Sequence, residues 1–161
     1  MGDDRNWVLV AEDADDLRSD YVAWLRDAGY QVLAAANGLE ALEFARARGP
    51  GVVVMNLDLP VLDGRATARA LRRDPRLPAT KIVALAPAGV NEGEAKSAGC
   101  DAMLRIPVQR GAFLSAVADF MPATDHESLD RLKIAQPAGV FRSWLALARS
   151  FDRPARQSRK L

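Results

Sequence analysis

Residues 52–64 constrain the fold of this chain more than any other stretch. The stretch opens with a continuous apolar run, 52–55, whose β-branched residues are typical of a strand buried on both faces of a parallel sheet. The run ends at Asn56, and a proline and an Asp-Gly pair then predict a loop before the next helix. In open α/β sheets, binding and chemistry gather at the carboxyl ends of strands. Asn56 and Asp58 therefore stand where we expect a site.

The rest of residues 1–121 alternates between short apolar runs and segments with helical periodicity. Strands are predicted at 7–11, 31–35, 52–56, 81–85 and 102–106, and helices at about 15–28, 38–48, 65–73, 91–98 and 109–121. Five strands alternating with five helices indicate an α/β fold, in which right-handed crossovers build a parallel sheet.

Composition points to one globular domain with a short extension. Of the 161 residues, 49% are hydrophobic and 27% charged, which is typical of a globular protein. Residues 1–121 carry 14 Lys and Arg against 17 Asp and Glu, whereas residues 122–161 carry 8 against 4. Cys100 is the single cysteine, so no internal disulfide is expected. With no signal-peptide pattern and no apolar stretch of roughly 18 residues, we expect a cytoplasmic protein.

The loop after Asn56 resembles the phosphoacceptor segment of bacterial response-regulator receiver domains, in which Asp-x-x-x-Pro-x-hydrophobic-Asp-Gly ends a strand. The residues that match without a gap are Pro60, Leu62, Asp63 and Gly64. The resemblance covers residues 6–121 and includes an Ile-Pro junction at 106–107. It implies a flavodoxin-like, doubly wound, five-stranded parallel sheet of order 2-1-3-4-5 with five helices.

The same resemblance places the residues of a receiver pocket on this sequence. Receivers hold a divalent cation with two acids after the first strand, the phosphoacceptor Asp, and a carbonyl two residues beyond it. In this sequence the two acids are Glu12 and Asp13, and the phosphoacceptor position is Asn56. The carbonyl belongs to Asp58. A neutral carboxamide forms no acyl phosphate, because phosphoryl transfer needs an anionic oxygen. For the metal ligands Asp13, Asn56 and Asp58, we expect weak or absent Mg²⁺ binding, and we expect no other cofactor.

Three further positions depart from the receiver pattern. The hydroxyl residue after the fourth strand is Ala86, the lysine before Pro107 is Ile106, and the switch aromatic of the fifth strand is Met103. Loss of a single positioned donor can slow such electrostatic catalysis roughly 10²–10³-fold. We therefore predict a degenerate phosphoacceptor pocket with no catalytic residue, in a protein that is not an enzyme. Asn56 removes one negative charge from the pocket and Ile106 removes one positive charge, so the net charge of the pocket is unchanged. This balance favours a receiver that still functions without phosphate over one that has drifted after losing its function.

Asp58 offers an alternative acceptor. Its side chain could join Glu12 and Asp13 in a carboxylate cluster for Mg²⁺ and be phosphorylated in place of Asn56. An ordinary solvated loop acid is the competing interpretation, and the sequence leaves both open.

Residues 122–161 predict a helical extension with a basic tail. A helix over 140–151 would carry an apolar face, and its candidate partner-binding residues are Phe141, Trp144, Leu145 and Phe151. Four of the last nine residues are Arg or Lys.

These features favour a phosphorylation-independent, receiver-like adaptor of a bacterial two-component pathway that acts by protein–protein interaction. Its expected partner is a histidine kinase or another response regulator, with a homodimer as a further option. One alternative is a phosphorelay receiver that uses Asp58. The other, less favoured, is a binder of DNA or anionic membranes through the basic tail.

Overall fold

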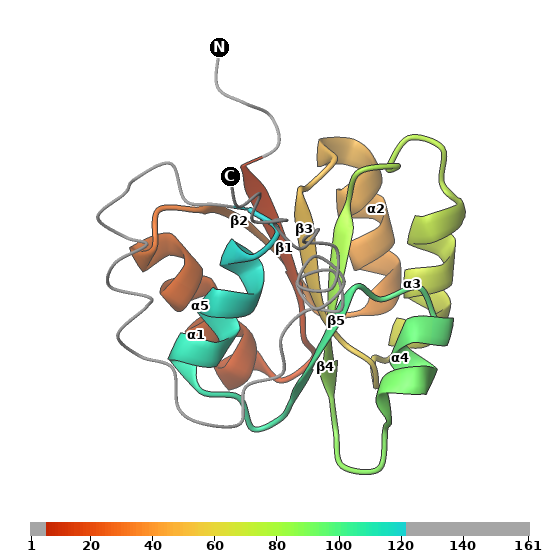
Figure 1. The fold of residues 1–161 in the computed structure, drawn as a ribbon. Helices are drawn as coiled ribbons and strands as arrows, with labels where there is room; N and C mark the ends of the chain where they lie inside the picture. Colours follow the sequence, from red (N-terminus) through yellow and green to blue (C-terminus); the bar gives the residue numbers. More distant parts are fainter. Residues whose placement is uncertain (1–5, 122–161) are drawn as a thin grey trace, which may run out of the picture.

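The computed structural model describes residues 6–121, which form one five-stranded parallel sheet flanked by helices (Figure 1). The strand order is β2-β1-β3-β4-β5, as predicted. The strands are β1 (Trp7–Ala11), β2 (Gln31–Ala35), β3 (Val52–Asn56), β4 (Lys81–Ala86) and β5 (Ala102–Arg105). Every neighbouring pair is parallel, so all five carboxyl ends lie along the same edge of the sheet.

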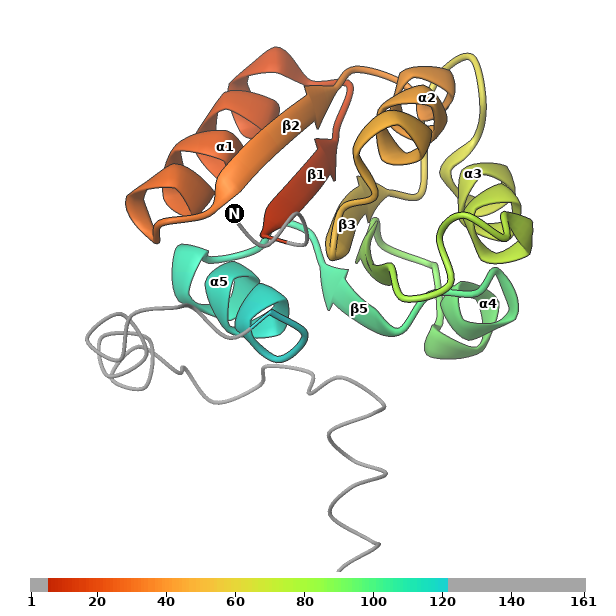
Figure 2. The same cartoon turned by 90° about the horizontal axis from the view of Figure 1, so that it is seen from above.

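Helices cover both faces of the sheet, which makes the fold doubly wound. They are α1 (Asp15–Asp27), α2 (Gly38–Arg48), α3 (Gly64–Arg73), α4 (Glu92–Ser97) and α5 (Arg110–Ala118). Figure 2 shows α1 and α5 on one face and α2, α3 and α4 on the other. The flavodoxin-like architecture predicted from the sequence is confirmed.

The sheet divides the core into two layers because side chains alternate along each strand. Val10 and Val54 pack on the side of α1 and α5, where Phe113 stacks against Tyr21 at 4.7 Å between ring centroids. Met55 belongs to the layer beneath α2, α3 and α4. All of β3 is buried, as its continuous apolar run predicted.

The boundaries differ from the predictions by a few residues. β4 extends to Ala86, whereas β5 ends at Arg105 rather than at Ile106, because Pro107 has no N–H to continue the ladder. α5 begins at Arg110 and ends at Ala118, three residues short of its predicted end. The Phe120 N–H turns back to the carbonyl of Val117, and this tighter turn terminates the helix.

None of the helices described for residues 6–121 is long and apolar enough to cross a bilayer. The predicted extension, 122–161, lies outside the described residues. Its partner-binding candidates, Phe141, Trp144, Leu145 and Phe151, therefore stay predictions.

Candidate functional site at the carboxyl edge of the sheet

The site forms where β1 and β3 end side by side. Ala11 is paired with Met55 across the two strands, so the next residues, Glu12 and Asn56, are neighbours at the edge of the sheet. Both side chains are buried although both are polar: Glu12 is 1% exposed and Asn56 is 8% exposed. Buried polar groups of this kind need hydrogen-bond partners.

Both ends of the Asn56 amide form hydrogen bonds. Its Nδ2 donates to Glu12 Oε1 at 3.3 Å and to Oε2 at 3.2 Å, and its Oδ1 accepts from the Asp58 N–H at 2.9 Å. The Ala14 N–H donates to Glu12 Oε1 at 3.1 Å. No buried side-chain nitrogen or oxygen within residues 6–121 is left without a partner. The two carboxyl-edge residues therefore form a closed hydrogen-bonded pair.

The charge of Glu12 is controlled by this environment. Burial raises the pKa of the Glu12 carboxyl; the Ala14 N–H and the Asn56 amide act in the opposite direction, and nearby Asp13 adds to the rise. A carboxylate at position 56 would bring a second negative charge to within about hydrogen-bond distance of Glu12. The amide instead donates to that carboxylate, so Asn56 and Glu12 are chemically complementary.

A close backbone approach fixes the loop that follows Asn56. A Cβ on Gly64 would lie 2.3 Å from the carbonyl oxygen of Asn56, so only glycine fits at this position. The side chain of Asp63 caps α3 by accepting from the Arg65 N–H at 3.1 Å. In the loop between β3 and Asp63, Val61 adopts a left-handed conformation with φ of 69°. The Asp-Gly pair therefore holds the start of α3 against the end of β3.

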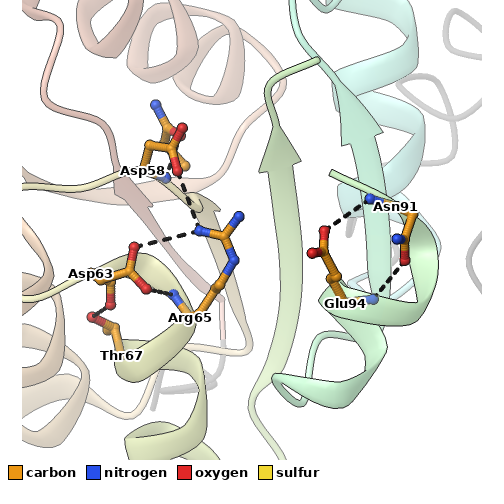
Figure 3. A network of polar contacts seen from close by, with 7 residues as sticks. Asp58, Asp63, Arg65, Thr67, Asn91 and Glu94 are labelled. Atoms are coloured by element: carbon orange, nitrogen blue, oxygen red, sulfur yellow. Dashed lines mark hydrogen bonds and ion pairs between the residues drawn. The ribbon is translucent and has the colours of Figure 1, made fainter. Parts of the chain in front are cut away.

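Arg65 joins the site from the first turn of α3, and the sequence analysis missed it. Its NH1 lies 3.3 Å from Asp58 Oδ1 and 3.6 Å from Asp63 Oδ1. Figure 3 shows the guanidinium facing both carboxylates. The Asp58 side chain is 61% exposed and points toward this guanidinium. Thr67 Oγ1 donates to the carbonyl of Asp63 at 2.9 Å and steadies the turn. An arginine directly after the Asp-Gly pair was the available signal, but its pairing depends on the loop geometry.

The remaining predicted residues lie in the core or at its margin. Ala86 and Met103 are buried in the layer beneath α2, α3 and α4, consistent with a packing role for the methionine. Ile106 is half-buried against the opposite layer, and the Ile106–Pro107 peptide bond is cis. None of these side chains brings a hydroxyl or an ammonium group to the carboxyl edge.

The residues present differ from the ligand set that the receiver resemblance implies for a divalent cation. Asn56 Oδ1 already accepts a backbone N–H, and its Nδ2 is a donor that no cation can use. The Asp58 carboxylate, which the alternative of an Asp58 acceptor placed in a cluster with Glu12 and Asp13, is instead paired with Arg65. Asp13 is exposed beside buried Glu12. Within residues 6–121, no three His, Cys, Asp or Glu side chains come together as a group that could hold a metal.

Comparison with known proteins gives the family. The family model for the response regulator receiver domain matches residues 8–118, most of the chain. The chain belongs to the response-regulator receiver family. It is a receiver domain of two-component signalling, and its fold follows that family.

Relatives and solved structures agree with this assignment. The polar-differentiation response regulator DivK of Brucella anthropi is 26% identical over 117 residues, which cover 71% of this chain and 94% of DivK. The receiver domain of the sensor histidine kinase PA1611 from Pseudomonas aeruginosa, solved with magnesium in its active-site cleft, is 27% identical. Its TM-score is 0.65, with 71% of this chain and 95% of that chain covered.

A third similar protein was solved in a complex. The receiver domain of Ssk1 from Saccharomyces cerevisiae, crystallised with the histidine phosphotransfer protein Ypd1, is 26% identical with a TM-score of 0.66. The match covers 76% of this chain and 95% of that chain.

Proposed function

We propose that this receiver works without being phosphorylated and signals as an adaptor that binds other proteins. The observation that carries the proposal is the engagement of Asn56. Its amide nitrogen donates to both oxygens of Glu12 and its oxygen accepts the Asp58 N–H. An amide in this position offers no anionic oxygen for attack on a phosphodonor.

The surrounding side chains support the same conclusion. Ala86 has no hydroxyl to bind a phosphoryl oxygen, and Ile106 has no charge to neutralise it. The protein is accordingly proposed not to catalyse its own phosphorylation or dephosphorylation, and to need no cofactor. A pocket that lacks the acceptor carboxylate, the hydroxyl donor and the lysine cannot stabilise the transition state of phosphoryl transfer.

Arg65 supplies a fixed positive charge to the loop between β3 and α3. Its guanidinium lies between the carboxylates of Asp58 and Asp63 and offsets their repulsion. Because that charge is covalently part of α3, the loop does not depend on a ligand for its neutralisation. This favours a single standing conformation over a switch driven by phosphate.

Exposed apolar side chains at the same edge support a protein partner. Within residues 6–121, the large hydrophobic side chains that are exposed are Leu17 (40%), Leu39 (45%) and Val61 (77%). Leu17 and Leu39 lie in the first turns of α1 and α2, and Val61 lies in the loop before α3. In a parallel α/β fold, all three places border the carboxyl edge of the sheet.

The proposed partner is a protein of the same signalling chemistry, a histidine kinase, a phosphotransfer protein or another response regulator, in the cytoplasm. The similar Ssk1 receiver was solved bound to a phosphotransfer protein. Such a contact would need shape and apolar surface at the pocket edge but no phosphoryl transfer. The predicted helix over 140–151 is a second candidate contact.

The test is intact-mass analysis of the full chain after incubation with acetyl phosphate and Mg²⁺. The wild-type protein is expected to gain no phosphoryl group. The control is a triple variant, Asn56→Asp with Ala86→Thr and Ile106→Lys, which restores acceptor, hydroxyl and lysine and is expected to become labelled. A phosphoryl adduct mapped to Asp58 in the wild-type protein would overturn the proposal and establish the phosphorelay alternative.

A further inference from the structure

A groove open to solvent lies between the carboxyl-terminal ends of α2 and α3, which pack side by side (Figure 2). It has a volume of about 530 Å³ and is lined by Arg46, Ala70, Arg73, Asp74, Pro75 and Arg76. Because helices in this fold run antiparallel to the strands, their carboxyl ends mark the amino edge of the sheet. The groove therefore lies at the edge opposite Asn56, and its chemistry is independent of the phosphoacceptor position.

A buried carboxylate organises two of the arginines. The Asp74 side chain is 3% exposed, and it accepts from Arg46 Nε at 2.8 Å and from Arg76 Nε and NH2 at 2.9 and 2.7 Å. The Arg76 backbone N–H donates to it as well, at 3.0 Å. These donors, Arg76 first and then Arg46, hold the pKa of Asp74 far below its usual range. The carboxylate is thus ionised at neutral pH and orients both guanidinium groups.

The groove still carries an excess of positive charge. The single carboxylate of Asp74 faces three arginines, so the lining has a formal charge of +2. Arg46 and Arg76 stay 40% and 62% exposed, and Arg73 makes no hydrogen bond or ion pair among the contacts found within residues 6–121. Guanidinium N–H groups therefore remain available to a ligand.

Helix electrostatics explain only part of this arrangement. Basic residues in the last turn complement the negative end of a helix, which accounts for Arg46 and Arg73. Arg69, however, lies in the middle of α3, four residues before Arg73, and like charges at that spacing repel. No acidic residue occurs in α3 to relieve the repulsion. Arg65 and Arg72 have acidic partners, whereas Arg69 and Arg73 have none among the contacts of residues 6–121, and Arg73 lines the groove. This uncompensated charge favours binding of an external anion.

The charge balance of residues 6–121 favours one kind of anion at this groove. Residues 6–121 contain 13 Lys and Arg against 15 Asp and Glu, a net charge of −2. An extended polyanion such as a nucleic acid gains from phosphate contacts spread over a basic face, which this acidic body does not offer. A short carboxylate-bearing segment needs only the local groove, where planar guanidinium forks match carboxylates in pairs. Ala70 and Pro75 add an apolar wall against which the methylene groups of glutamate can pack.

We infer that the Arg46–Arg73–Arg76 groove is a docking site for an acidic peptide segment of another protein. The experiment is fluorescence anisotropy of a labelled octaglutamate peptide titrated with the full chain at low salt. Arg73→Gln is the main variant, because Arg73 has no hydrogen bond or ion pair with any other residue of 6–121. Arg105→Gln is the matched control, since it removes an equal charge from an exposed residue of β5. This control also accounts for binding to the basic residues at 153–160.

We expect Arg73→Gln to weaken peptide binding about tenfold and Arg105→Gln to weaken it less than about twofold. Asp74→Asn should weaken binding even though it adds positive charge, because it frees Arg46 and Arg76 from their fixed orientation. Equal effects of the two arginine variants, or tighter binding by Asp74→Asn, would show that bulk charge alone attracts the peptide and would overturn the inference. Tighter, Arg73-dependent binding of a single-stranded 12-nucleotide DNA would equally overturn the choice of an acidic peptide.

Discussion

At the scale of single residues, the amide at position 56 removes a repulsion as well as a nucleophile. Glu12 is buried to 1% exposure, and burial already raises the pKa of its carboxyl. Asn56 donates to both oxygens of that carboxylate and so favours its charged form. The closed pair stabilises the edge of the sheet in the absence of a cation.

Replacing Asn56 with Asp is therefore expected to destabilise the protein in a pH-dependent way. Two adjacent buried carboxyls cannot both ionise, so the folded state retains a proton that the unfolded chain releases above a pH of about 4.5. The loss of unfolding free energy should be small near pH 4.5 and reach roughly 1–3 kcal/mol at pH 7.5. Urea denaturation at both pH values measures it.

Asn91→Asp is the matched control, because Asn91 is exposed and caps α4, where Asp is an equally good cap. It should change stability little at either pH. A loss for Asn56→Asp that is the same at pH 4.5 and pH 7.5 would mean that repulsion with Glu12 is not its cause.

Val61 carries the clearest backbone strain in the described region. Its φ of 69° places a β-branched side chain in the left-handed region, and the side chain is 77% exposed. Val61→Asn should raise the unfolding free energy by about 1 kcal/mol, because Asn tolerates this conformation. Val61→Thr removes apolar surface but keeps the branch, so urea denaturation should show no comparable gain. A gain of equal size in both variants would assign the effect to surface polarity instead.

At the scale of elements, Arg72 ties α3 to the strands beside it. Its Nε donates to the Gly99 carbonyl at 2.6 Å, its NH1 donates to the Thr80 carbonyl at 2.7 Å, and its NH2 pairs with Asp101. Asp101 in turn accepts the Ile82 N–H at 2.8 Å, at the start of β4. One guanidinium thus joins a helix to the segments before β4 and β5.

Arg72→Met is expected to lower the unfolding free energy by about 1–3 kcal/mol, since it leaves carbonyls and the Asp101 carboxylate without their donor. The neighbouring Arg73→Met should stay within about 0.5 kcal/mol of wild type, because Arg73 makes no such contacts. Thermal or urea unfolding of the pair of variants compares them directly. Similar losses in both would indicate a helix-propensity effect and not the loss of this network.

The elements themselves were largely predictable from the sequence. Continuous apolar runs bounded by turn residues placed all five strand starts and the whole of β3, and Gly49 ends α2 in the left-handed conformation that a glycine cap implies. The ends of β5 and α5 were misplaced, because periodicity does not reveal where a ladder or a final turn stops.

The candidate site was predictable in its members but not in its contacts. Parallel strand order brings Glu12 and Asn56 to one edge, as expected. The pairing of Arg65 with Asp58 depends on the path of the loop, which includes an unexpected left-handed valine. Ala86 and Ile106 showed from the sequence that the site lacks a hydroxyl and a lysine. They did not show that Arg65 would contribute a charge to the neighbouring loop.

At the scale of the whole molecule, two opposite edges of one sheet carry different chemistry. The carboxyl edge bears the Asn56–Glu12 pair, Arg65 and exposed apolar side chains, whereas the amino edge bears the arginine groove. The two edges belong to one sheet whose faces are both covered by helices (Figures 1 and 2). An adaptor that contacts two partners at once would be served by this arrangement without any phosphate-driven switch.

The most direct test of phosphorylation-independent action is the response of the full chain to a phosphoryl mimic. Two-dimensional ¹H–¹⁵N spectra recorded with Mg²⁺ alone and with Mg²⁺ plus beryllofluoride would report on every backbone amide described here. We predict that the Asn56, Ala86 and Met103 resonances do not move, because no carboxylate at position 56 can hold the mimic. Saturable shifts that begin at Asp58 and extend to Ala86 and Met103 would contradict the account.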